Sequence, residues 1–432
     1  MNGTELDENL QKLLSHIDSI NDTLPMTLVL LTPYQKKANE KLQEFIKENV
    51  KEVEDNNGQK SISIKYEHFK FFQQLSKNTY TSQLASKIIP ESLFVSLISQ
   101  YDAFLNRLLK IIFNIRPEYI NNSDRELIFS QLIEFKTIED AREFIIEKEV
   151  ETILRKSHSE HFDYLEKKLS IPLRENLPIW QNFIEITERR NLYAHCDGIV
   201  SSQYLKVCKD NNCEIEGIEL NQKLNVDLDY LNQTYKCIYE LCVKLTHTIW
   251  RKLIKEDLEN ADNRLNNICY DLINSNQFKL ADILLDFACK QNRHFNESSK
   301  NFLIVNKSLS QYLQDNKKNA KIIIESKDWS ASSDNFKLAH LVLTEEHEES
   351  YKLMKKIGNK GEVEKGSYKT WPLFSRLRKE LRFKETFLEI FHEEYSILEN
   401  PKRPVQELIE ELNQEKPILK INTKKKKKEQ PV

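Results

Sequence analysis

Glycine is scarce in this chain: the sequence contains 7 glycines among 432 residues, whereas globular proteins usually contain about 7%. Charged residues make up 30% of the sequence and hydrophobic residues 39%. Lysine, glutamate, leucine and isoleucine are all common, and most of these residues suit a helix. The composition therefore predicts an all-α protein. A chain of this length should hold two or three domains and bury a substantial core.

Long apolar segments are also missing. The longest apolar run, residues 24–31, contains a proline and is far shorter than the roughly 20 residues of a membrane-spanning helix. The first residues are acidic and polar, unlike a secretory signal. We therefore expect a cytoplasmic protein without membrane contact.

Neither charge nor cysteine content points to a particular ligand. The net charge of −3 gives the whole chain no attraction for nucleic acid, so a nucleic-acid site would need a local basic patch. The seven cysteines are odd in number and scattered, which is typical of reduced thiols. Cys208 and Cys213 bracket a short polar stretch, but no second cysteine pair or well-placed histidine pair completes a zinc site. No metal and no cofactor are expected.

Helical patterns fill the first half of the chain. Residues 1–53 predict one or two helices with a break at Pro25, residues 55–59 form a turn signal, and the alternation in residues 61–66 indicates a short strand or an extended linker. A long amphipathic helix is expected over residues 92–115, because Pro117 disfavours its continuation.

Further helix starts are marked by capping residues. Ser123 and Thr137 each stand three places before an acidic residue, the pattern of a capping box. Other helices are expected over residues 163–169, from Trp180 to a C-terminal cap at about Gly198, and over residues 227–253. We therefore predict an N-terminal helical segment at residues 1–60 and a helical domain at residues 61–254.

The C-terminal half contains an internal repeat, since residues 276–285 resemble residues 334–343. We predict tetratricopeptide-like helical hairpins over residues 255–398, a candidate surface for a partner protein. Residues 399–432 predict a flexible tail, whose five lysines at 424–428 are either a solvated end or a loose contact with RNA, DNA or a membrane surface. The aromatic side chains expected in the core of the repeats are Trp329, Trp371 and Phe374.

One segment combines side chains that suit phosphodiester chemistry. A histidine, with an intrinsic pKa near ~6.5, can take and give protons near neutral pH. An arginine stays charged and can hold a phosphate oxygen. Asn191 precedes His195 by four places and so shares its helix face. The segment reads Glu188-Arg189-Arg190-Asn191-Leu192-Tyr193-Ala194-His195.

The stretch from Arg190 to His195 resembles the R-x4-6-H motif of the HEPN superfamily, and an asparagine directly after the arginine is common in its ribonuclease branch. Residues 94–105 look like the long early helix of these domains, so the resemblance covers roughly residues 85–250. It implies a HEPN-like helical bundle and a metal-independent endoribonuclease. The 2′-hydroxyl of RNA would attack the adjacent phosphate, leaving a 2′,3′-cyclic phosphate and a 5′-hydroxyl.

The resemblance also implies roles for three residues. His195 would be the general acid or base, Arg190 would hold the phosphate, and Asn191 would orient the imidazole or a phosphate oxygen. Arg190 and His195 are about 140° apart on an ideal helix. In HEPN nucleases two such motifs meet across a dimer interface, so a homodimer or larger oligomer with a composite site is expected.

Alternatives within the same region stay open. Arg189 is a second candidate for the phosphate clamp, and Glu188 and Asp102 are candidates to hold an arginine by ion pairing. A Glu-Arg-Arg run is also typical of a solvated helix face. His158 and His161 have a spacing that can bind metal, but with no third ligand evident we interpret them as polar residues at a helix end. The adjacent Arg155 and Lys156 are candidates for an RNA path.

The sequence thus predicts an endoribonuclease that acts on RNA in anti-phage defence or toxin-like growth arrest, with the helical repeats as sensor or scaffold. The rival is a non-catalytic interaction protein whose repeats bind a partner and whose HEPN-like half dimerises or holds nucleotide. A third alternative is the partner of an antitoxin-like nucleotidyltransferase.

Overall fold

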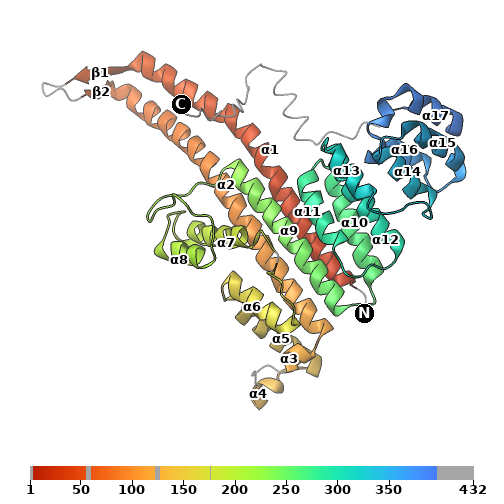
Figure 1. Cartoon of the computed structure of the whole chain (residues 1–432). Coiled ribbons are helices and arrows are strands. Elements are labelled where there is room, and N and C mark those ends of the chain that lie inside the picture. Colours follow the sequence, from red (N-terminus) through yellow and green to blue (C-terminus); the bar gives the residue numbers. More distant parts are fainter. Residues whose placement is uncertain (1–2, 55–59, 122–126, 176, 397–432) are drawn as a thin grey trace, which may run out of the picture. The chain divides into compact units, whose positions relative to one another are not determined.

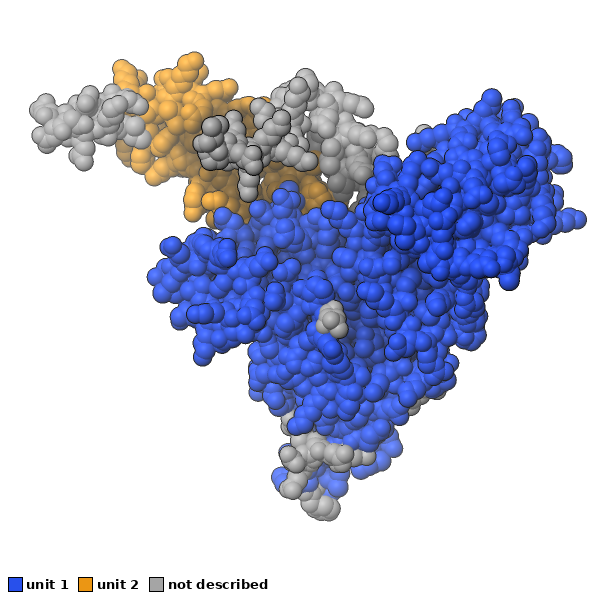
Figure 2. Space-filling model, in the orientation of Figure 1, with its two compact units in different colours: residues 1–20, 90–398 blue, residues 21–89, 399–432 orange. Residues whose placement is uncertain are grey.

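The computed structural model describes residues 3–54, 60–121, 127–175 and 177–396. Helix accounts for about 75% of the chain, which confirms the all-α class. The chain divides into two compact units, one of residues 1–20 and 90–398 and the other of residues 21–89 and 399–432 (Figure 2). The segment boundaries expected from the sequence stay a prediction.

The elements are labelled in Figure 1. The chain begins with α1 Thr4–Asn49, β1 Val50–Glu54, β2 Lys60–Ile64 and α2 Tyr66–Ile115. The next helices are α3 Glu118–Asn121, α4 Phe129–Leu132, α5 Ile138–Leu154, α6 His158–Leu169, α7 Trp180–His195, α8 Ser202–Asp210 and α9 Leu228–Leu253. The later helices are α10 Leu258–Asn274, α11 Phe278–Cys289, α12 Glu297–Leu313, α13 Lys317–Ile324, α14 Asp334–Leu343, α15 His347–Ile357, α16 Lys365–Thr370 and α17 Leu381–Phe391. Three short 3₁₀ helices are η1 Gly358–Lys360, η2 Pro372–Phe374 and η3 Leu377–Lys379.

The unit of residues 21–89 contains two helical segments joined by an antiparallel strand pair. Val50 of β1 lies opposite Ile64 of β2. Of the two alternatives for residues 61–66, the short strand is confirmed as far as Ile64, whereas Tyr66 already belongs to α2 and β1 was not expected. Between the helices, Gln35 Nε2 donates a hydrogen bond to the Ser82 carbonyl at 2.7 Å. The turn expected at 55–59 and the cap expected at Ser123 lie outside the described residues.

The expected break at Pro25 is wrong, because α1 continues through both Pro25 and Pro33. A proline removes the hydrogen bond of its own nitrogen and crowds the preceding turn, but the residues on both sides remain helical. Next to Pro25, the hydroxyl of Thr27 also donates to the carbonyl of Thr23 at 2.8 Å. The sequence signal of a proline is therefore local, and the flanking helix formers outweigh it.

Several helix ends follow the expected signals. The start of α5 has the expected capping box, with Asp140 N donating to Thr137 Oγ1 and Thr137 N donating to Asp140 Oδ2, both at 3.1 Å. Asp227 caps α9 through the amide of Tyr230 at 2.8 Å. Helix α2 ends at Ile115, as expected, but it begins well before the expected residue 92.

Residues 4–20 of α1 pack inside the larger unit, against α2 and α9. Asn9 Nδ2 donates to the carbonyl of Phe104 at 3.2 Å, and Arg107 Nε donates to Asn9 Oδ1 at 2.7 Å. The hydroxyl of Tyr235 on α9 donates to Asp18 Oδ1 at 2.7 Å. The buried apolar residues of this segment are Leu6, Leu10, Leu13, Leu14 and Ile17.

Three consecutive helical hairpins, α10–α11, α12–α13 and α14–α15, form the first part of the C-terminal half. Each connection contains one residue with a left-handed backbone: Asn276 at φ 58°, Asp315 at φ 63° and Glu345 at φ 64°. Helix α12 packs against both α10 and α14, as expected of stacked hairpins. The tetratricopeptide likeness stays a prediction. The amide after each left-handed residue bonds to the carbonyl five residues earlier, in the pairs Gln277–Leu272, Asn316–Gln311 and Glu346–Leu341.

The sequence repeat does not follow these hairpins. Residues 276–285 lead into α11, the second helix of the first hairpin, whereas residues 334–343 form α14, the first helix of the third hairpin. Each matched segment contains a fully buried alanine, Ala281 or Ala339. The match therefore reflects a requirement for a small residue where two helices pack together. Of the aromatic residues expected in the core, Trp329 and Phe374 are buried and Trp371 is half-buried.

No helix among the described residues is long and apolar enough to cross a membrane. The tail of residues 399–432, with its lysines, lies outside the described residues.

Two buried histidines predict that the protein loses stability in mild acid. Burial lowers the pKa of His161 to about 4 and that of His247 to about 3. Both rings are therefore neutral in the folded protein at pH 5, where the histidines of the unfolded chain, with a pKa of about 6.5, bind protons. The unfolded state gains more protons below pH ~6.5, so the free energy of unfolding falls as pH falls, by up to about 1.4 kcal/mol per pH unit for each histidine.

Urea unfolding at several pH values between 5 and 7 measures this slope. In a His247→Phe variant the unfolding free energy should depend less steeply on pH, because the contribution of one histidine is lost. This holds whatever the absolute stability of the variant. An unfolding free energy that is constant across this range would contradict the prediction.

Candidate functional site

The predicted site residues meet in one cleft of about 650 Å³, which we call the α7 cleft. Its walls come from α2, the junction of α5 and α6, α7, and the start of α8. Five of the six predicted residues line it, whereas Arg189 does not. These five are Asp102, Glu188, Arg190, Asn191 and His195.

Helix α7 is held by a buried face and a fixed C-terminus. The C-cap is Cys196, two residues before the expected Gly198, and the amides of Cys196 and Gly198 both donate to the carbonyl of Leu192, at 2.7 and 3.1 Å. Gly198 has φ +75°, and a Cβ there would lie 2.9 Å from the ring of Tyr193. The Tyr193 hydroxyl in turn donates to the carbonyl of Leu224 at 2.6 Å. The exposed His195 is therefore the last residue of a well-anchored helix. The buried apolar face of α7 consists of Phe183, Ile184, Ile186 and Leu192.

Asp102 on α2 links two other side chains of the α7 cleft, because each oxygen of its carboxylate contacts one of them. Its Oδ2 accepts a hydrogen bond from Arg190 Nη2 at 2.8 Å, and its Oδ1 lies 3.0 Å from His158 Nε2. An ionised carboxylate can only accept, so the Nε2 atom of His158 carries the proton. Of the two carboxylates proposed to hold an arginine, Asp102 is thus the one that pairs with Arg190.

The charge of Asp102 is stabilised by these neighbours. Burial alone would raise the pKa of Asp102, but the hydrogen bond and charge of His158 and the charge of Arg190 outweigh it, so its pKa lies below the usual value. Glu188 differs, since burial raises its pKa despite nearby positive charge. Its Oε1 accepts from Asn191 Nδ2 at 3.3 Å. The site thus contains one firmly ionised carboxylate and one that is protonated more readily.

Arg189 faces another part of the unit. Its Nε donates to Glu185 Oε1 at 2.7 Å, and its guanidinium carbon lies 4.0 Å from the ring centre of Tyr230. Glu185 also accepts hydrogen bonds from the hydroxyls of Tyr204 and Tyr230, each at 2.7 Å. A guanidinium held in such a cluster is not available to bind a ligand in the α7 cleft. Arg190 is therefore better placed than Arg189 to hold a phosphate there.

The histidines of α6 take a larger part in the site than the sequence indicated. His158 and His161 lie at the start of α6, but they are only 7% and 2% exposed, not solvated polar residues. Both line the α7 cleft, together with Arg155 and Lys156. Sequence reasoning noticed these four residues but had no signal that α6 packs beside α2 and α7. The link between His158 and Asp102 spans 56 positions.

No group of three or more histidine, cysteine, aspartate or glutamate side chains in the described ranges could hold a metal ion. Cys208 and Cys213 are both buried, and the Cys213 thiol donates to the carbonyl of Gln181 at 3.2 Å.

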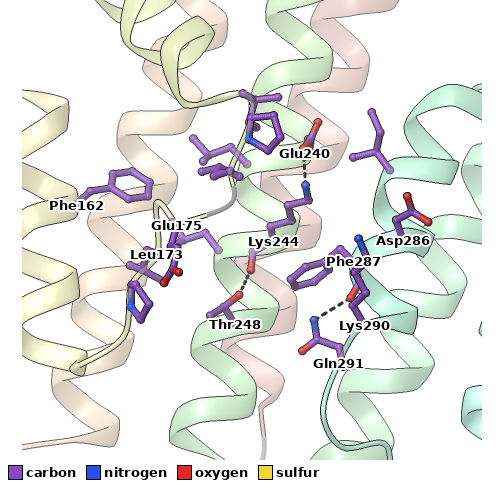
Figure 3. Close-up of a pocket in the computed structure, with 17 residues that line it drawn as sticks. Phe162, Leu173, Glu175, Glu240, Lys244, Thr248, Asp286, Phe287, Lys290 and Gln291 are labelled. Carbon is purple, nitrogen blue, oxygen red and sulfur yellow. Dashed lines mark hydrogen bonds and ion pairs between the residues drawn. The ribbon is translucent and has the colours of Figure 1, made fainter. Parts of the chain in front are cut away.

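A second cavity, of about 550 Å³, contains none of the predicted site residues. It lies between α6, the segment before α7, α9 and α11 (Figure 3). Figure 3 shows Glu240 and Lys244 pointing toward each other, and their charged atoms are 2.5 Å apart. Asp286, on the opposite wall, pairs with Lys307 at 2.5 Å. Three of the charged side chains that line this cavity are held in these ion pairs and no histidine in the described ranges lines it, so it offers less for acid–base chemistry than the α7 cleft.

No protein-family model, curated protein or solved structure matches this chain. The resemblance to the HEPN superfamily therefore stays a prediction from the sequence.

Proposed function

We propose that this protein is a metal-independent endoribonuclease of the HEPN type. The observation that carries the proposal is the arrangement of the α7 cleft, where His195, Arg190 and Asn191 line one cavity and Asp102 orients Arg190. Although Arg190 and His195 start about 140° apart on an ideal helix, the walls from α2, α5, α6 and α8 make a single space that both side chains reach.

These groups suit cleavage by the 2′-hydroxyl of RNA. A base removes the 2′ proton, the oxygen forms a new bond to the neighbouring phosphorus, and the bond from phosphorus to the 5′ oxygen breaks as an acid supplies its proton. His195 is exposed at the end of α7, where it can take or give such a proton. Arg190 would stabilise the extra charge on the phosphorane.

A second copy of the chain completes the proposal. The reaction needs one group that accepts a proton and one that donates a proton, and a single His195 cannot do both at once. Two α7 clefts meeting in a homodimer would supply both, with Asn191 orienting a ring or a phosphate oxygen. In the cell, we place this activity in the cytoplasm, in anti-phage defence or toxin-like growth arrest, with the stacked hairpins as sensor.

The decisive experiment examines the ends of the products. Purified protein is incubated with a mixed RNA pool in the presence of a chelator, and we expect 2′,3′-cyclic phosphate and 5′-hydroxyl ends. The matched control is the same sequence with 2′-O-methyl riboses, which lacks the nucleophile and should stay intact. Intact RNA in both samples, at micromolar protein, would overturn the proposal.

The rival function is a non-catalytic interaction protein. Its supporting observation is the stack of hairpins from α10 to α15, because such stacks present extended binding surfaces. Intact RNA together with saturable capture of one partner by the C-terminal half would favour it.

A further inference from the structure

We propose that the end of the α7 cleft formed by Arg155 and Lys156 binds a second phosphate of the same RNA strand, beside the phosphate held at Arg190. The inference rests on the proposed function and specifies its substrate: a single strand that continues past the bond to be cut. It follows from the position, the charge and the hydrogen-bonding state of the residues at that end.

The position comes from the junction of α5 and α6. Arg155 is the C-cap of α5, Lys156 follows it, and Ser157 is the N-cap of α6. The side chains of Arg155 and Lys156 are exposed, yet both line the same cavity as Arg190 and His195. Two anion-binding groups are therefore arranged along one continuous cleft.

The charge at this end is not cancelled by an ion pair. Within the described ranges neither Arg155 nor Lys156 has a carboxylate partner within 4.0 Å, whereas Arg190 is paired with Asp102. The nearby Glu160 is turned back to the start of its own helix, where it accepts hydrogen bonds from Ser157 N at 2.9 Å and Ser157 Oγ at 2.7 Å. Two such cations in a cleft attract a phosphate and release its counterions.

A buried histidine lies at the same end of the cleft. His161 is 2% exposed and lines the cleft, and its ring is hydrogen-bonded to the backbone of Ile153 and Leu154. The exposed cations Arg155 and Lys156 are therefore the groups at this end that can bind a phosphate.

Two phosphates on one strand explain the arrangement better than one free anion. Arg190 holds the phosphate whose bond breaks. The cationic end formed by Arg155 and Lys156 lies apart from it, so it can strengthen binding only by holding another phosphate of the same strand. We therefore expect Arg155 and Lys156 to affect the binding of RNA and not the chemical step.

The test compares an Arg155→Gln/Lys156→Gln double variant with Lys318→Gln. Lys318 is an exposed lysine of α13 with no ion pair in the described part of the chain. The probe is a fluorescent single-stranded RNA oligonucleotide with 2′-O-methyl riboses, which binds without being cut. Its Kd is measured over a range of salt concentrations, and KM and kcat are measured with the matching unmodified RNA.

We expect the double variant to bind the probe about tenfold more weakly at low salt. The slope of log K against log salt should fall by about 0.7 for each lost phosphate contact. KM should rise correspondingly, kcat should stay within about twofold, and Lys318→Gln should match the wild type. Equal Kd values and slopes in the double variant and the wild type would overturn the inference.

The outcomes separate this inference from the proposed function. If the wild type binds the probe through Arg155 and Lys156 but never cuts RNA, the subsite stands and the nuclease fails. If the double variant cuts RNA with unchanged KM, the nuclease stands and the subsite fails. Inorganic phosphate that displaces the probe at concentrations near the Kd of the probe would show a site for a free anion, and would also overturn the inference.

Discussion

Replacing His195 by alanine should lower RNA cleavage by about 10²–10⁴-fold, the usual contribution of a positioned acid or base. The side chain is exposed at the end of α7, so its removal should leave stability within about 0.5 kcal/mol. The measurement is kcat/KM for the appearance of cyclic phosphate ends, with thermal unfolding and oligomer size measured in parallel. Expression of the variant should also lose any toxicity shown by the wild type.

A matched control for this variant is His16→Ala. His16 is likewise exposed and on a helix, and its Nδ1 lies 2.7 Å from Gln100 Oε1. It does not line the α7 cleft, so this variant should cut RNA at the wild-type rate. Wild-type activity in His195→Ala would end the catalytic assignment, whereas equal loss in both variants would point to a general defect.

Replacing Asp262 by alanine should cost about 3–5 kcal/mol of unfolding free energy, the range for breaking a buried ion pair. Asp262 is 1% exposed. Its Oδ1 accepts from Arg251 Nη2 at 2.6 Å and lies 3.2 Å from His294 Nδ1, and its Oδ2 accepts from the amide of Phe295 at 2.7 Å. Without the carboxylate, the side chains of Arg251 and His294, which are 9% and 8% exposed, lose their partner.

Urea unfolding of three variants tests this prediction. Asp262→Asn keeps the shape and some hydrogen bonds but removes the charge, so its stability should lie between those of the wild type and Asp262→Ala. Asp328→Ala removes an exposed carboxylate that accepts hydrogen bonds from Ser330, and its unfolding curve should match that of the wild type. A loss below about 1 kcal/mol in Asp262→Ala would mean that water replaces the carboxylate and that the network is not as buried as described.

The parts of the fold that sequence reasoning predicted well depend on local signals. The capping box at Thr137 and the helix end before Pro117 both involve residues within a few positions of each other. The break expected at Pro25 was wrong because a proline is a local signal that its neighbours can outweigh. The long run of helix formers around Pro25 compensates for one lost hydrogen bond.

The parts that it did not predict depend on contacts between distant segments. Arg189 and Arg190 are neighbours in sequence, but about 100° separates their directions on a helix. Only the packing of α7 decides that Arg190 faces Asp102 and Arg189 faces Glu185. The pairing of Arg190 with Asp102 spans 88 positions. The sequence therefore named the candidate residues but could not show which of them pair. The burial of His158 depends on the same packing.

The shared carboxylate of Asp102 has a consequence for related sequences. A single substitution at position 102 removes the partner of both Arg190 and His158, so each side chain would need water or another acid as a partner. Positions 102, 158 and 190 should therefore vary as a set during evolution, because spatial neighbours constrain one another. A search pattern that spans only the arginine and histidine of one helix leaves out the acid on which that arginine depends.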